Sequence, residues 1–258
     1  MCQISLLCCV IMPQNKCKRR LKNARMQVRE LVFRQKKQGY RYNIDTFLLY
    51  DFATRCNLRG KVLDVGCGCG IVGILLKVKF AEISLFLLDI LKQNCDLTRQ
   101  NLKDNDIEAQ VLCANFAEFV SDEKFDFIVS NPPFYRQGAL KAANKHTQIG
   151  KFASSLSLES FVKSSNALLK PQGKLYFCYE VGALQELCAV LATHKLKITR
   201  LVFVHKNAHE KARLALIEAK KSSKSPCEVN SFFVYENGKL SVKMQEIYTT
   251  IRIKSLDI

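Results

Sequence analysis

The sequence lacks the patterns expected of a secreted, metal-binding or membrane protein. Its 12 cysteines include no C-x-x-C pair, and several lie in apolar periodic segments, as small buried side chains do. His205 and His209 have helical spacing, but no cysteine or carboxylate pair completes a metal site. No apolar run is long enough to span a bilayer, and the run "ISLLCCVIM" precedes its basic cluster, the reverse of a secretory signal. We therefore expect a cytoplasmic protein with no metal and no membrane contact.

Acidic residues are also few. The chain has 23 Asp and Glu against 40 Lys and Arg, a net charge of +17. Residues 1–60 carry +10, residues 61–135 carry −4, and residues 136–258 carry +11. This distribution suits a middle that binds a small cationic or neutral ligand and flanks that hold a polyanion such as nucleic acid. A lysine-rich proteome would produce the same excess, so charge alone leaves both explanations open.

The first 25 residues differ from the rest of the chain. Met26 opens a stretch of ordinary composition. We expect residues 1–25 to be a disordered leader, or to precede the true start of translation, and residues 26–258 to form one domain.

From residue 60 onward, short apolar runs alternate with helical patterns, which predicts an α/β fold. The expected strands are 61–65, 83–89, 108–114, 125–130, 174–179, 197–205 and 213–220, and the expected helices are 70–80, 91–105, 158–169 and 184–194. Residues 197–205 and 213–220 read as a strand pair, and 231–242 as a hairpin around Asn237-Gly238. The prediction is a mostly parallel, seven-stranded sheet with helices on both faces.

The stretch "VLDVGCGCGIVG", residues 62–73, predicts a strand, a glycine loop and a helix, the geometry of close backbone contact with a cofactor. It fits G-x-G-x-x-G, with Asp89 about 20 residues on, as in dinucleotide-binding proteins. It also fits D-x-G-x-G-x-G, the first motif of class I S-adenosylmethionine-dependent methyltransferases. In that case the cofactor-binding residues are Asp64, Gly66, Cys67, Gly68, Gly70 and Asp89. A tight turn without a ligand is the third alternative.

The stretch "VSNPPFY", residues 129–135, favours the methyltransferase. Proline cannot continue a central strand, so Asn131, Pro132, Pro133 and Phe134 form a stiff loop after the strand 125–130. N-P-P-F resembles the signature of enzymes that methylate a planar nitrogen. Asn131 and the Pro132 carbonyl can accept the hydrogens of a ring-conjugated amine, and the rigid loop preorganises them. Phe134 offers a flat face for a flipped base, and Tyr135 can stack or pack.

Taken together, residues 28–250 resemble the bacterial N6-adenine methyltransferases that act on valine tRNA at adenosine 37. The resemblance rests on "FRQKKQGYRYNIDTFLLYDFA" (33–53), "DVGCGCG", "SNPPFY", "VHKNAHEKARLALIEAKK" (204–221) and "FFVYENGKLSVKMQEIY" (232–248). It implies a Rossmann-like class I methyltransferase, S-adenosylmethionine as cofactor, tRNA as partner and a monomer. Arg41 and Asp45 are expected either to close over the cofactor or to be a surface charge and a helix cap.

The chain departs from that family at one cofactor position. Many relatives carry an Asp against the cofactor adenine where this chain has Asn115, which can still accept a hydrogen bond. Three alternatives remain: a glutamine methyltransferase of release factors, which also uses N-P-P; a methyltransferase of ribosomal RNA or DNA; and a non-catalytic RNA-binding protein. The basic residues of 16–41 and of 206–224 are candidates for the tRNA backbone path.

Overall fold

The computed structural model of the chain describes residues 30–37, 41–132 and 156–258. Leu31–Ile258 forms a single compact unit. The predicted leader, Pro133, Phe134 and Tyr135 lie outside the described residues. Within those residues, no helix has the length and apolarity needed to cross a bilayer.

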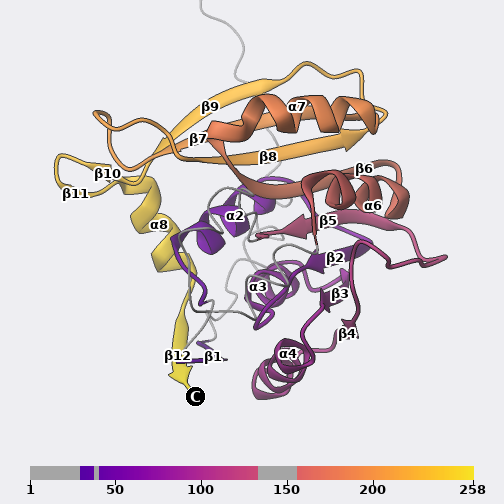
Figure 1. The fold of residues 1–258 in the computed structure, drawn as a ribbon. Helices are drawn as coiled ribbons and strands as arrows, with labels where there is room; N and C mark the ends of the chain where they lie inside the picture. The colour runs from indigo at the N-terminus through magenta and orange to yellow at the C-terminus, as the bar shows by residue number, and fades with distance from the viewer. Residues whose placement is uncertain (1–29, 38–40, 133–155) are drawn as a thin grey trace, which may run out of the picture. The chain divides into compact units, whose positions relative to one another are not determined.

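An eight-stranded sheet organises this unit, in the order β4-β3-β2-β5-β6-β8-β7-β9 (Figure 1). Neighbouring strands are parallel except for β8, which runs antiparallel to β6 and β7. The strands are β2 (Lys61–Val65), β3 (Ser84–Asp89), β4 (Gln110–Cys113), β5 (Phe125–Ser130), β6 (Leu169–Glu180), β7 (Leu196–His205), β8 (Leu214–Lys221) and β9 (Glu228–Phe233). The predicted α/β class and largely parallel sheet are confirmed.

Helices cover both faces of the sheet (Figure 1). They are α2 (Ile44–Thr54), α3 (Ile71–Lys79), α4 (Lys92–Asp104), α6 (Leu158–Leu168), α7 (Leu184–Thr193) and α8 (Val242–Thr250), with a short 3-10 turn η2 (Val181–Ala183). Residues of α2, α3 and α8 belong to one buried cluster, and residues of α6 and α7 to the other. Adjacent residues of β2, such as Val62 and Leu63, are buried in opposite clusters, which is why apolar residues follow one another in this strand without alternating with exposed polar ones.

The strand count of the prediction was wrong. The eighth strand, β9, was expected to be part of a hairpin, and only Phe232 among its six residues is buried. A strand with so little buried apolar surface leaves no alternating pattern in the sequence. The predicted hairpin is confirmed only at its tip, where β10 (Tyr235–Glu236) pairs with β11 (Lys239–Leu240).

Residues 170–173, which separate the expected helix 158–169 from the expected strand 174–179, lie inside β6. Gln172 has a φ of 62°, and the pairing of β6 with β5 shifts register there. A bulge of this kind uses the same residue types as a turn, so the sequence cannot separate the two.

A second, two-stranded sheet was not predicted. It joins β1 (Leu31–Gln35) in parallel to β12 (Ile253–Asp257), near the two ends of the described chain. Two asparagines of α4 hold β1 against the domain. Asn105 accepts from the Val32 N–H and donates to the Val32 carbonyl, and Asn101 does the same for Arg34, over distances of 2.7–3.1 Å. The two side-chain amides thus bond the backbone of β1 as a neighbouring strand would.

We expect Asn105→Leu to lower the free energy of unfolding by about 1–3 kcal/mol, because it leaves the N–H and carbonyl of half-buried Val32 without these partners. Urea denaturation would measure the loss, and hydrogen exchange at Val32 would locate it. The control is Gln100→Ala on the exposed side of α4, where a change within about 0.5 kcal/mol is expected. Equal stabilities of the two variants would contradict the role given to Asn105.

Candidate active site

The order of the strands reverses at β2. Strands β3 and β4 follow it on one side, whereas β5 lies on the other. The register pairs Val65 with both Leu88 and Ser130, and Asp89 with Cys113, so four carboxyl ends lie level with one another. Open α/β sheets bind ligands in the crevice at such a reversal.

The loop after β2 adopts a conformation that glycine favours. Gly66, Gly68 and Gly70 have φ values of 67°, 59° and 82°. A Cβ at Gly66 or Gly68 would meet no described atom within 4 Å, so the loop presents bare backbone there. Its other side is fixed, since the Gly66 N–H donates to the Leu88 carbonyl over 2.8 Å. One side of the loop backbone is therefore fixed by hydrogen bonds, and the other side is open to close contact with a ligand.

Asp64 lies beneath this loop and is 2% exposed. Its Oδ2 accepts a 2.8 Å hydrogen bond from the Gly73 N–H, near the start of α3. A Cβ on Gly73 would come within 3.0 Å of that oxygen, so only glycine allows the approach without a shift. Burial raises the pKa of Asp64 to about 7, the Gly73 bond lowers it in part, and the Asp89 charge raises it further.

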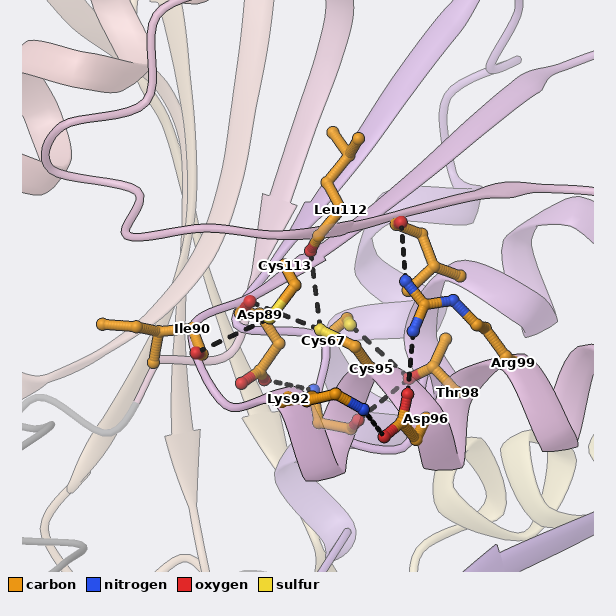
Figure 2. Close-up of polar contacts among 12 residues, drawn as sticks. Cys67, Asp89, Ile90, Lys92, Cys95, Asp96, Thr98, Arg99, Leu112 and Cys113 are labelled. Carbon is orange, nitrogen blue, oxygen red and sulfur yellow. Dashed lines mark hydrogen bonds and ion pairs between the residues drawn. The ribbon is translucent and has the colours of Figure 1, made fainter.

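Asp89 ends β3 and faces the same loop (Figure 2). Its Oδ2 accepts from the Gly68 N–H over 2.9 Å, and its Oδ1 accepts from the Leu91 N–H and the Asn94 amide over 2.9 and 3.1 Å. Burial raises the pKa of Asp89, and these bonds, with the Lys36 charge, oppose the rise. Two buried carboxylates beside an open backbone favour a ligand that carries hydroxyls or positive charge.

Helix α4 supports the glycine loop with side chains that were not predicted. The Thr98 hydroxyl donates to the Gly68 carbonyl and the Asn101 amide to the Cys69 carbonyl, each over 2.9 Å. Both side chains are buried. Polar residues at helical spacing on the buried face of α4, namely Thr98, Asn101 and Asn105, are the sequence signal that could have identified them.

The two thiols of the glycine loop have raised pKa values. Burial raises the pKa of Cys67 strongly and that of Cys69 to about 11, and the nearby carboxylates raise both further. Cys95 of α4 contacts the Asp89 and Leu112 carbonyls, at 3.4 and 3.6 Å (Figure 2). Every cysteine in the described part of the chain is free, and no cluster of His, Cys, Asp and Glu there would hold a metal ion.

Asn131 and Pro132 follow β5 directly, on the side of β2 opposite Asp89. The Ser130 hydroxyl, fully buried, donates to the Val65 carbonyl over 2.7 Å and so ties the end of β5 to the start of the glycine loop. The Asn131 amide nitrogen lies 3.4 Å from the Thr46 hydroxyl in the first turn of α2. This contact orients the Asn131 side chain through its amide nitrogen rather than through its oxygen.

The remaining predicted residues have other partners in the described structure. Asn115 follows β4, and its Oδ1 accepts from the Ala117 N–H over 3.1 Å. Asp45 lies in the first turn of α2, where its N–H donates to the Asn43 cap, and burial raises its pKa. Arg41 forms a two-pronged ion pair with Asp257 of β12, at 2.8 and 3.2 Å.

The structure thus brings Asp64, Gly66, Cys67, Gly68, Gly70, Asp89, Asn115 and Asn131 to one edge of the sheet. Asp45 is close to this group, because it adjoins Thr46. The contact of Arg41 is with the C-terminal strand, and its contact with a cofactor stays a prediction.

We expect a pH dependence of stability that Asp64 causes. Its folded pKa, about 7, exceeds the unfolded value, so its contribution is full at acid pH and is lost as pH rises from about 4 to about 7, by up to about 1.4 kcal/mol per pH unit. Asp64→Asn keeps an acceptor for Gly73 and removes the ionisation. Urea denaturation across this range should show a flatter profile for the variant. Parallel profiles would contradict the assignment.

The fold is that of class I S-adenosylmethionine-dependent methyltransferases. A protein from Listeria monocytogenes assigned to that class superimposes with a TM-score of 0.56, at 13% identity, over 82% of this chain and 73% of its own. The predicted Rossmann-like fold is therefore confirmed, and the cofactor prediction agrees with it.

Relatives are found among RNA methyltransferases. The ribosomal RNA small subunit methyltransferase C of Actinobacillus pleuropneumoniae is 40% identical over 88 residues, 34% of this chain. That match spans only 26% of the relative's length. The tRNA1(Val) (adenine(37)-N6)-methyltransferase of Christiangramia forsetii is 25% identical over 70% of this chain and 79% of its own. The resemblance inferred from the motifs is thereby confirmed.

The model of one protein family matches residues 43–195, more than half of the chain, and its description is the methyltransferase small domain. The matched range contains the glycine loop, Asp89 and the Asn131 loop. The chain belongs to the methyltransferase small domain family.

Proposed function

We propose that the chain transfers a methyl group from S-adenosylmethionine to the exocyclic N6 of an adenine in RNA, with adenosine 37 of valine tRNA as the target. The observation that carries this proposal is the position of Asn131 and Pro132. They follow β5 at the strand reversal, across β2 from Asp89, where a cofactor and an extruded base would meet.

The glycine loop and the two carboxylates are the proposed cofactor site. Gly66, Cys67, Gly68 and Gly70 would pass under the methionine part of the cofactor. Asp89 would accept hydrogen bonds from the ribose hydroxyls, for which its oxygens retain lone pairs beside the three N–H bonds they accept. Asn115 would face the adenine of the cofactor.

Beneath the loop, Asp64 would place negative charge close to a cofactor that carries a sulfonium and an ammonium group. A bound cation lowers the pKa of a neighbouring carboxyl, so Asp64 would ionise when the cofactor binds.

Asn131 and Pro132 are the proposed catalytic residues, with Pro133 and Phe134 completing the loop. The Asn131 side-chain oxygen and the Pro132 carbonyl would each accept one hydrogen of the adenine amine, which turns its lone pair toward the methyl group. The new N–C bond forms as the S–C bond of the sulfonium breaks, giving S-adenosylhomocysteine. The proton leaves the alkylated nitrogen for water after transfer, so no general base is needed. Phe134 and Tyr135 would contact the base.

RNA is the proposed partner because of the relatives and the charge. The relatives' names specify tRNA and ribosomal RNA. Exposed cations follow the carboxyl edge of the sheet, including Lys206, Lys211 and Arg213, and would contact the phosphate backbone. The monomeric state and the cytoplasmic location stay predictions.

A second candidate target is ribosomal RNA. The highest identity among the relatives described here, 40%, is to a ribosomal RNA methyltransferase, although over a short segment. The assay that tests the main proposal also separates the two, because both RNAs can be supplied to the same enzyme.

We expect the purified chain to methylate bulk tRNA from a strain lacking the gene, with N6-methyladenosine found in valine tRNA after digestion. Asn131→Ala should lower the rate about 10²- to 10³-fold, because it removes an acceptor that holds the reacting amine. Cofactor affinity, measured by calorimetry, should change little. The control is Asn230→Ala on the exposed edge strand β9, which should retain full activity.

Three outcomes would redirect the proposal. Label in ribosomal RNA but not in tRNA would favour the second target. Label in release factor alone would favour the glutamine methyltransferase. Cofactor binding without transfer to any of these would remove the assignment to RNA N6-adenine methylation.

A further inference from the structure

A row of aromatic rings runs from β1 through the first turn of α2 to α8. Phe47 follows Thr46, the residue whose hydroxyl lies 3.4 Å from the Asn131 amide. The Phe47 ring packs edge-to-face on Tyr42, with centroids 5.8 Å apart, and on Tyr248 of α8, at 5.9 Å. The row therefore joins α8 to the turn of α2 whose Thr46 contacts Asn131.

The inner end of this row is fixed to the domain. Tyr42 packs edge-to-face on Phe33 of β1, at 6.5 Å, and Phe33 is fully buried. Rings held in this way are preorganised, so little conformational freedom is lost when a ligand contacts them.

The outer end of the row is exposed to solvent. Tyr248 is 41% exposed and Tyr235, in the hairpin β10–β11, is 39% exposed. The Ser241 N–H, at the N-cap of α8, donates to the Val234 carbonyl over 2.9 Å, which holds the start of the hairpin against the helix that carries Tyr248. Figure 1 shows α8 alongside α2, with the hairpin at the start of α8. Few large apolar side chains of the described chain are this exposed, and these two are its aromatic members.

Cations border the same end. The Tyr235 N–H donates to the Lys206 carbonyl over 2.8 Å, and Lys239 lies in the same hairpin as Tyr235. Lys206 is paired with Glu210, whereas Lys239 lies opposite Glu236, so the charge here is mixed rather than uniformly basic. The rings, rather than the cations, are the distinctive feature of this surface.

We propose that Tyr42, Phe47, Tyr248 and Tyr235 form a stacking surface for the unpaired nucleotides that flank the target base. This inference rests on the proposed function, in which a base must leave its stack to reach Asn131. The neighbours of an extruded base lose a stacking partner, and exposed rings beside the site replace it. Ring faces accept every base, so the surface favours single-stranded RNA over duplex without reading its sequence.

The test is equilibrium binding of the full chain to two fluorescein-labelled RNAs at one salt concentration. One is a single strand without self-complementarity, and the other is a blunt duplex of the same length. We expect Tyr235→Leu combined with Tyr248→Leu to weaken single-strand binding about tenfold or more, because stacking on both rings is lost. Duplex binding should stay within about twofold of the wild type.

Two controls separate stacking from charge and from folding. Tyr235→Phe combined with Tyr248→Phe keeps the ring faces and should bind both RNAs as the wild type does. Lys239→Gln should weaken both RNAs and reduce the salt dependence of binding, which the leucine variant should leave unchanged. If the double variant unfolds, Tyr235→Leu alone replaces it, because Tyr235 lies in an exposed hairpin. This single variant should lose less affinity, and only for the single-stranded RNA.

Unchanged single-strand affinity in the leucine variants, or an equal loss for both RNAs, would overturn the proposal. Methyl transfer distinguishes its failure from failure of the proposed function. Ring-dependent binding without N6-methylation would leave the stacking surface standing and remove the proposed reaction. N6-methylation with an RNA KM that the leucine variants do not change would leave the proposed reaction standing and remove the stacking surface.

Discussion

The glycine loop after β2 depends on hydrogen bonds to its own carbonyls. Three residues with positive φ cannot bond one another as a helix or strand would, so the loop needs partners from elsewhere. Thr98 and Asn101 of α4 supply them from one side, and the Leu88 carbonyl holds the loop amides from the other. These hydrogen bonds hold the loop without covering the backbone surface that would contact a cofactor.

The same helix connects this loop to the periphery. Asn101 bonds both the Cys69 carbonyl and the backbone of Arg34, so one amide group joins the loop to β1. β1 pairs with β12, whose Asp257 bonds Arg41 shortly before α2, and the first turn of α2 contacts Asn131. Residues that would bind the cofactor and residues that would position the amine are therefore held by one continuous set of bonds.

Local patterns in the sequence predicted the parts of the fold in which pattern and burial coincide. The runs at 61–65 and 125–130 are buried strands, and the helices at 71–79 and 92–104 fall within one residue of their expected ends. The pairing of β1 with β12 was missed because it joins segments some 220 residues apart, as the Gln35–Ser255 bond shows. No local periodicity encodes such a partner.

Residues of the candidate site were likewise predicted where a local pattern marks them and missed where their partner is distant in the sequence. Motif spacing predicted that Asp64, Asp89 and Asn131 lie close together, because each lies at or next to the carboxyl end of a strand whose position in the sheet is regular. Thr98 and Thr46 were missed, since a threonine in a helix resembles any other polar residue until its partner is known. Asn115 shows the opposite difficulty. Its position was predicted, but the sequence does not predict that its side-chain oxygen accepts a hydrogen bond from the Ala117 N–H.

The pairing of β1 with β12 has a consequence for synthesis on the ribosome. The central sheet can begin to assemble as its strands emerge, but β1 must wait for residues 253–257, which are made some 220 residues later. Until then Arg41 has no Asp257 to pair with, and the strand that leads into α2 lacks its neighbour. The segment bordering the glycine loop is thus completed only after every strand of the central sheet has been synthesised, which makes closure of the site a late step in folding.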